Sequence, residues 1–248
     1  MAWKAHPRWR LLLLGNRDEM HARPSAPLSR WDDAPHLMAG RDLRAGGTWM
    51  GVDDHGRAGV VTNVRDPAAS LDGASRGHLV ADYLRGTADA AAYARGLARR
   101  AADYRPFNLL LCDAADACYL GNHPHLRRQR VAPGVHGLSN ADFNAPWPKT
   151  RKLVARLRTW IDTGDDDFDR LFDALADDSR WPDAVLPDTG VGIELERELS
   201  AAFIRGNRYG TRASTLIAID HDGTGCIIER RFGPGGTVEG DSVMDLGG

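Results

Sequence analysis

A stretch of polar side chains directly follows an apolar run near the start of the chain. Residues 11–14 are four leucines, which is typical of a buried strand, and Asn16, Arg17, Asp18 and Glu19 come next. Successive side chains of a strand alternate between its two faces, so Arg17 and Glu19 point one way and Asn16 and Asp18 the other. Such groups can bind an ionic ligand or orient a nucleophile. We expect one of the two pairs to face a cleft.

Four further blocks place polar residues beside glycines or at the ends of predicted strands. Their candidate ligand-binding residues are Arg41, Trp49, Asn63, Arg65, Asn140 and Arg212. Glycines near a tryptophan indicate that backbone passes close to a large flat surface, either another strand or a ligand. Packing explains the glycines but not the adjacent Arg-Asp pairs that recur in these blocks. We expect the blocks to converge on one pocket at the rim of two stacked sheets.

The elements that must position these blocks come as hairpins and helix pairs. Strands are predicted at residues 48–53, 57–63, 107–112, 118–121, 126–131, 136–140, 211–219 and 225–232. Helices are predicted at residues 75–85, 87–102, 148–161 and 168–175. The segment from Gly233 onward is interpreted as a glycine-rich tail. This order lacks the strict alternation of a doubly wound parallel sheet and favours antiparallel sheets covered by helix pairs. With no linker or internal repeat, residues 1–248 are predicted to form a single domain.

Composition excludes several classes of protein. The 248 residues are 42% hydrophobic and 27% charged, as in globular chains, and the formal net charge of −2 offers no basic surface for nucleic acid or an anionic membrane. No apolar run approaches the roughly 18 residues of a membrane span. Three cysteines are an odd number that suits a reducing compartment. We predict a small-molecule ligand, no nucleic-acid partner, no transmembrane segment and a cytoplasmic location, and we leave the oligomeric state open.

Three weaker patterns are interpreted as ordinary structure. The aspartates within residues 165–169 lack the glycine and the final glutamate of a calcium loop. His123 and His125 have no third ligand at recognisable spacing. Cys112 and Cys118 are too far apart for a redox motif and lie in or beside apolar runs. We therefore predict no metal site.

The blocks together resemble the NRDE family, also called the Transport and Golgi organization protein 2 family. They match it in order over residues 3–215, and the most specific motifs are Asn16-Arg17-Asp18-Glu19 and Gly46-Gly47-Thr48-Trp49. The resemblance implies an α+β fold, a four-layer αββα sandwich similar to N-terminal nucleophile hydrolases. In such a fold, two mostly antiparallel sheets are covered by helix pairs.

Two functions follow from the resemblance. One is haem binding or haem trafficking, which needs a cleft but no nucleophile. The other is amide hydrolysis, as in the similar penicillin V acylases and bile-salt hydrolases, which use an N-terminal cysteine. By position, Arg17 and Asp18 would steady that nucleophile and Asn140 would stabilise the oxyanion. Arg212 would lower the thiol pKa or hold an anionic substrate.

The start of the chain departs from the family pattern. Members begin Met-Cys-Leu, whereas this chain begins Met1-Ala2-Trp3-Lys4. We therefore expect a non-catalytic carrier with haem as its cargo. The alternative is an N-terminal cysteine amidohydrolase or acyltransferase whose true start lies upstream, so the sequence leaves open whether the protein is an enzyme. Haem would meet Trp49 and the arginines at positions 17, 41, 65 and 212, and no histidine spacing marks an axial ligand.

Overall fold

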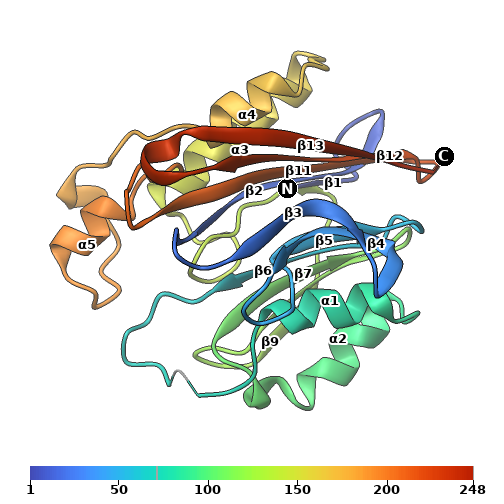
Figure 1. Ribbon diagram of the computed structural model, residues 1–248, viewed down its shortest axis with the longest axis horizontal. Coiled ribbons are helices and arrows are strands. Elements are labelled where there is room, and N and C mark those ends of the chain that lie inside the picture. The colour runs from blue at the N-terminus through green and yellow to red at the C-terminus, as the bar shows by residue number, and fades with distance from the viewer. Residues whose placement is uncertain (71, 248) are drawn as a thin grey trace.

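The computed structural model describes residues 1–70 and 72–247. Its strands form two antiparallel sheets stacked face to face, with a pair of helices on each outer side (Figure 1). The predicted αββα sandwich is confirmed. Leu71 and Gly248, which belong to the predicted domain, lie outside the described residues.

Sheet A has six strands, and its longest pair is β2 with β11. In sheet order the strands are β10 (Gly134–Val135), β1 (Ala2–Trp3), β2 (Trp9–Met20), β11 (Tyr209–Asp220), β12 (Gly225–Phe232) and β13 (Val238–Leu246). β11 pairs with β2 from Met20 to Trp9, whereas β1 pairs only with Leu11 and Leu12. On the side facing β1, the edge of β2 beyond Leu12 therefore meets no strand in the part of the chain that is described.

Sheet B has seven strands in sequence order, so it is built entirely from consecutive antiparallel neighbours. They are β3 (Ser25–Trp31), β4 (Ala34–Asp42), β5 (Met50–Asp53), β6 (Ala58–Asn63), β7 (Phe107–Cys112), β8 (Ala117–Gly121) and β9 (Arg127–Arg130). The predicted hairpin at residues 48–63 is present, and Gly56 adopts a positive φ of 68° in its turn. That conformation suits glycine because other residues are strained there.

Three longer strands, β3, β4 and β13, and the two-residue strands β1 and β10 were not predicted, and one predicted strand is wrong. β3 and β4 carry prolines and charges that hide their alternation, and β13 lies within the segment interpreted as a glycine-rich tail. The strand expected at residues 136–140 is absent. The short β10 ends just before it, and the His136 amide donates to the Met1 carbonyl oxygen, 2.8 Å away.

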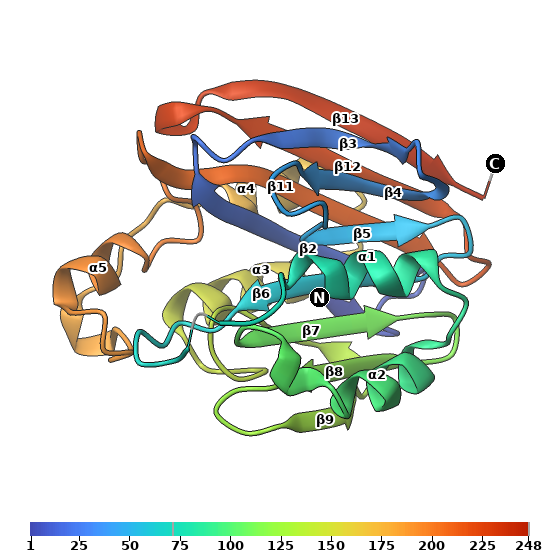
Figure 2. The ribbon, with the colours of Figure 1, turned by 60° about the horizontal axis from the view of Figure 1, so that its bottom comes forward.

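Four of the five α-helices in the described residues form the outer layers. They are α1 (Gly77–Arg85) and α2 (Ala90–Ala98) over sheet B, and α3 (Pro148–Asp162) and α4 (Asp169–Leu175) over sheet A. α5 (Ile193–Glu198) lies beyond the end of the sandwich (Figure 2). None of the helices in residues 1–70 and 72–247 combines the length and the apolar composition needed to cross a bilayer.

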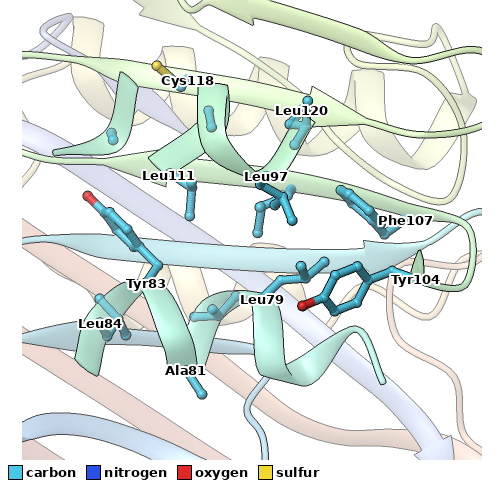
Figure 3. Close-up of a cluster of buried hydrophobic side chains, with 14 of the residues drawn as sticks. Leu79, Ala81, Tyr83, Leu84, Leu97, Tyr104, Phe107, Leu111, Cys118 and Leu120 are labelled. Carbon is cyan, nitrogen blue, oxygen red and sulfur yellow. The ribbon is translucent and has the colours of Figure 1, made fainter. Parts of the chain in front are cut away.

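Three apolar clusters hold the four layers together. Between α1, α2 and sheet B lie Leu79, Tyr83, Leu97, Phe107 and other buried side chains (Figure 3). The leucine strand contributes to both remaining clusters, because Leu11 and Leu13 pack between the sheets while Leu12 and Leu14 pack toward α3 and α4. The same alternation then decides where the polar residues of β2 point.

Candidate functional site

A cavity of about 400 Å³ lies along the unpaired edge of β2. Every residue from Leu13 to Glu19 contributes to its wall. Because neighbouring residues of a strand face opposite sides of the sheet, a cavity that touches all seven must follow the strand edge. Its volume falls within the range of small-molecule sites.

The wall joins an apolar part to a charged part. The apolar part includes Leu13, Met50, Val60, Leu110, Leu138 and Leu153. The cationic side chains are Arg17, Arg23, Arg65, Arg76, Arg105 and Lys149, and the acidic ones are Asp18, Glu19 and Asp42. The cavity therefore suits a ligand with an apolar body and anionic groups.

The structure brings most of the predicted site residues to this cavity. Those in its wall are Asn16, Arg17, Asp18, Glu19, Trp49, Asn63, Arg65 and Asn140. They come from β2, from the loop before β5, from the end of β6 and from the loop after β10. Arg41 and Arg212 are not part of the wall.

Arg17 is a buried charge in the wall whose side chain donates no hydrogen bond within the described residues. Its guanidinium carbon lies 4.5 Å from the centre of the Trp49 ring, a cation–π geometry, and its side chain is only 9% exposed. The nearest carboxylate contact is Nη2 to Glu19 at 4.0 Å. Arg17 Nη1 and Trp49 Nε1 are both buried and find no hydrogen-bond partner among the described residues. Two neighbouring side chains thus offer unused N–H groups.

Asn16 and Asp18 point to the opposite side of β2, toward α3 and α4. The Asn16 amide donates to the carbonyl oxygens of Leu175 and Ala202, each at 2.8 Å, and therefore ties β2 to the end of α4 and to the segment before β11. Asp18 accepts a hydrogen bond from Thr211 Oγ1 at 2.7 Å. Burial raises the pKa of Asp18, although the charge of Lys149 and the Thr211 hydrogen bond act in the other direction.

Lys149 is the functional candidate that sequence reasoning did not select. It lies in the first turn of α3, and its Nζ donates to the Leu199 carbonyl oxygen at 2.9 Å. Burial lowers its pKa to about 8, while the negative charge of Asp18 opposes that shift. A signal was present in the sequence: Pro148 marks a helix start, and a cation there opposes the helix dipole. A lysine at such a position calls for an explanation other than helix stability.

Asn63, Arg65 and Asn140 form one hydrogen-bonded group. Asn140 Nδ2 donates to Asn63 Oδ1 at 2.7 Å, and the Arg65 amide donates to the Asn140 carbonyl oxygen at 2.7 Å. The Arg65 guanidinium pairs with the buried carboxylate of Glu196 at 2.7 Å and lies over the Trp147 ring. Asn140 therefore joins two loops, and its side-chain amide is already engaged.

Arg41 points away from the cavity because strand alternation separates it from its neighbour Asp42. Arg41 pairs with Asp33 at 2.8 Å and stacks on the Trp31 ring on the outer face. Asp42 instead faces the cavity and pairs with Arg23 at 2.6 Å. Of the two adjacent residues, the strand thus presents the acid and not the arginine to the cavity.

Arg212 braces the turn that follows β2. Its Nη1 donates to the carbonyl oxygens of Met20, His21 and Arg23 at 3.2, 3.0 and 3.2 Å. It lies at the bulge of β11 beside the residue that pairs with Arg17. Arg212 therefore supports the strand that carries Arg17 without lining the cavity itself.

The cysteines and histidines add no reactive group to the wall. Cys112 and Cys118 are buried away from it, and burial raises the pKa of the Cys112 thiol to about 12. His136 reaches the wall, but Nε2 lies 2.8 Å from the Ala132 carbonyl oxygen and Nδ1 lies 3.2 Å from the Asn144 amide. Within residues 1–70 and 72–247, no three candidate ligands gather around a metal position.

Comparisons with known proteins identify the family of this chain. The family model for Transport and Golgi organisation 2 matches residues 1–234. The human Transport and Golgi organization protein 2 homolog is 31% identical over 242 residues, covering 90% of this chain and 86% of the relative. The Drosophila melanogaster protein of that name is 24% identical over 246 residues, covering 89% and 86%. A solved structure of a mutant conjugated bile acid hydrolase from Clostridium perfringens superposes with a TM-score of 0.48 at 7% identity, covering 95% of this chain and 83% of that one. The chain belongs to the Transport and Golgi organisation 2 family.

Proposed function

We propose that the cavity binds a small amphipathic anion and that the ligand is haem, which the protein carries without transforming it. A porphyrin has a flat apolar body and two carboxylates at one edge. The cavity has matching parts, because its apolar wall lies between the two sheets and its arginines lie toward the end of β2.

The observation that carries this proposal is the pair of unused donors on Arg17 and Trp49. A buried donor without an acceptor destabilises a protein by about 1–3 kcal/mol, and a charged one by more. Arg17 Nη1 and Trp49 Nε1 have no partner among the described residues and are closed off from solvent, so an incoming carboxylate would accept hydrogen bonds from them after these two side chains shift toward the cavity. Forming these hydrogen bonds would remove the free-energy cost of the two unpaired donors and would thereby stabilise the complex.

Other wall residues support the same ligand. Arg76 and Arg105 supply positive charge for a second carboxylate. Both ring nitrogens of His136 have partners already, so we propose that haem is held by its ring faces and carboxylates and not by strong iron ligation. Such binding is reversible, as a carrier requires.

The alternative function, an N-terminal cysteine amidohydrolase or acyltransferase, has one observation in its favour, because Met1 lines the cavity and its amino group donates to the His136 carbonyl oxygen at 2.7 Å. The three cysteines of the chain do not line the cavity, and Cys112 and Cys118 have raised thiol pKa values. We therefore favour binding over thiol chemistry for this cavity. All three thiols are free, which supports our further proposal that the protein works in the reducing cytoplasm.

A haem titration followed at the Soret band tests the proposal. We expect a shifted Soret band at micromolar protein. Arg17→Gln should weaken binding by roughly 10- to 100-fold, the value of a hydrogen bond to a charged group. Arg41→Gln is the matched control, since it removes an arginine that lies outside the wall, and it should leave affinity within about twofold.

A second ligand separates carboxylate recognition from general apolar binding. Haem dimethyl ester keeps the ring but lacks the two negative charges, so it should bind more weakly than haem and should not respond to Arg17→Gln. Absence of any Soret change with haem, or an equal loss in Arg17→Gln and Arg41→Gln, would count against the proposal.

A further inference from the structure

Lys149 has a setting that salt-bridge and surface lysines lack. Its Nζ has three N–H groups and one acceptor, the Leu199 carbonyl oxygen at 2.9 Å. No carboxylate within the described residues lies within 4.0 Å of it, whereas Lys152 pairs with Asp177 at 2.6 Å. Lys149 also lines the cavity, so a small molecule held there lies next to this side chain.

We propose that Lys149 is a carbonyl-reactive amine that forms a reversible imine with an aldehyde or ketone bound in the cavity. This goes beyond haem binding, which needs no covalent step. The amine nitrogen attacks the carbonyl carbon and, after one proton moves from nitrogen to oxygen, gives a carbinolamine. The carbinolamine hydroxyl then accepts a proton and leaves as water while the C=N bond forms. One carbonyl and one amine thus give one imine and one water, with no oxidation.

Charged groups face Lys149 from several directions. Three elements present titratable or charged groups to it: β2 presents Asp18, the segment after β6 presents Arg65, and α5 presents Glu196. Glu196 is already paired with Arg65 at 2.7 Å, so Asp18 is the carboxyl that is not held in an ion pair. Burial raises the pKa of Asp18, which favours its acid form, and in that form it can give a proton to the leaving hydroxyl; the resulting carboxylate offsets the charge of the protonated imine.

The protonation of Lys149 is consistent with a nucleophilic role. A pKa of about 8 in place of 10.5 makes the neutral fraction of the amine roughly 300-fold larger at pH 7. The first turn of α3 acts in the same direction, because the positive end of the helix dipole disfavours an ammonium. Neutral amines attack carbonyls, whereas ammonium groups do not.

The chain carries its own controls, since Lys4, Lys149 and Lys152 are its only lysines. The full-length protein is incubated with benzaldehyde, reduced with sodium borohydride and digested, and the modified lysines are identified by mass spectrometry. Peptide mapping separates them from the amino group of Met1. At pH 7, Lys149 should be labelled at least about tenfold more than Lys4 or Lys152. This factor is smaller than the roughly 300-fold larger neutral fraction of the Lys149 amine. Equal labelling of the three lysines would overturn the proposal.

Two variants sharpen this test. Lys149→Arg keeps a positive charge and should lose the benzaldehyde adduct in the cavity, whereas Lys152→Arg should keep it. Asp18→Asn removes the charge that opposes deprotonation of Lys149, so the pH midpoint of labelling should fall below the wild-type value near 8. An unchanged midpoint would exclude the role given to Asp18. Benzaldehyde has no carboxylate, so this result is independent of haem binding.

Discussion

Two buried arginines of the sandwich differ in how completely their hydrogen bonds are made. Arg57 lies at the end of the β5–β6 hairpin, and its Nε donates to the fully buried carboxylate of Asp53 at 2.7 Å. Its remaining N–H groups donate to the carbonyl oxygens of Tyr83, Leu84, Gly86 and Ala88, around the end of α1. Arg17 is also buried, yet it has one nitrogen with no partner in the described chain. A buried charge with every partner in place serves the fold, whereas one with a free donor at a cavity is available to a ligand.

Replacing Arg57 should produce the largest change in stability. Arg57→Met leaves the Asp53 carboxylate buried without its ion pair and frees several helix carbonyls, so we expect the free energy of unfolding to fall by about 3–5 kcal/mol. Urea unfolding followed by circular dichroism measures it. A loss below about 1 kcal/mol would break the comparison, because Arg57 would then be no more structural than a surface arginine.

The pH dependence of stability extends the comparison to Lys149. Its folded pKa of about 8 lies below the ordinary value of 10.5, so the unfolded chain binds the extra proton between these pH values. The contribution of Lys149 to stability therefore rises as the pH increases from 8, and since Lys149 is partly accessible we expect this contribution to grow by about 1–3 kcal/mol by the end of that window. The unfolding free energy of the wild type should rise relative to that of Lys149→Met between pH 8 and 9.5, before tyrosines titrate. Parallel curves would show that Lys149 is solvated like a surface lysine.

Replacing Arg17 should change stability in the opposite direction from replacing Arg57. Arg17→Met keeps the packing on Trp49 and removes a buried donor that has no partner in the described residues, so the free energy of unfolding should increase by about 1 kcal/mol without ligand. Differential scanning calorimetry detects such a change. A loss of several kcal/mol would place Arg17 with Arg57 as a structural residue.

Arg41 should show the smallest effect. Its contact with Asp33 is exposed and open to screening by salt, so Arg41→Met should change the free energy of unfolding by about 0.5 kcal/mol or less. Urea unfolding at low and high salt tests this expectation. If Arg41→Met lowered the free energy of unfolding nearly as much as Arg57→Met, the number of hydrogen bonds that an arginine makes would not predict its contribution to stability in this fold.

Local patterns were sufficient for much of the fold. The hairpin at residues 48–63 and the helices that begin near Ser75 and at Pro148 could be predicted because apolar spacing and turn residues act over a few positions. β3 and β13 could not be predicted in this way. Pro27 interrupts the alternation of β3, and exposed polar residues alternate along β13. Both are edge strands of their sheets in the described chain, so few of their residues are buried and the apolar pattern is weak.

The candidate site shows the same limit. Asn63, Arg65 and Asn140 could be predicted to converge because each follows a strand or lies in a loop beside one. Arg41 and Asp42 could not be distinguished, since which of them faces the cavity depends on the register of β4 against its partners. Lys149 was passed over because its importance comes from burial and from Asp18, which lies 131 positions earlier in the sequence.

The unpaired edge of β2 has a consequence for how this molecule exchanges deuterium. Amides that point from Leu13–Glu19 into the cavity have no neighbouring strand in the described chain, although they lie beside the buried core. They should exchange quickly with heavy water in the free protein, while amides paired with β11 exchange slowly. A bound molecule covering that edge would slow the first group alone, so an exchange map of one strand would show where the ligand lies even before its identity is known.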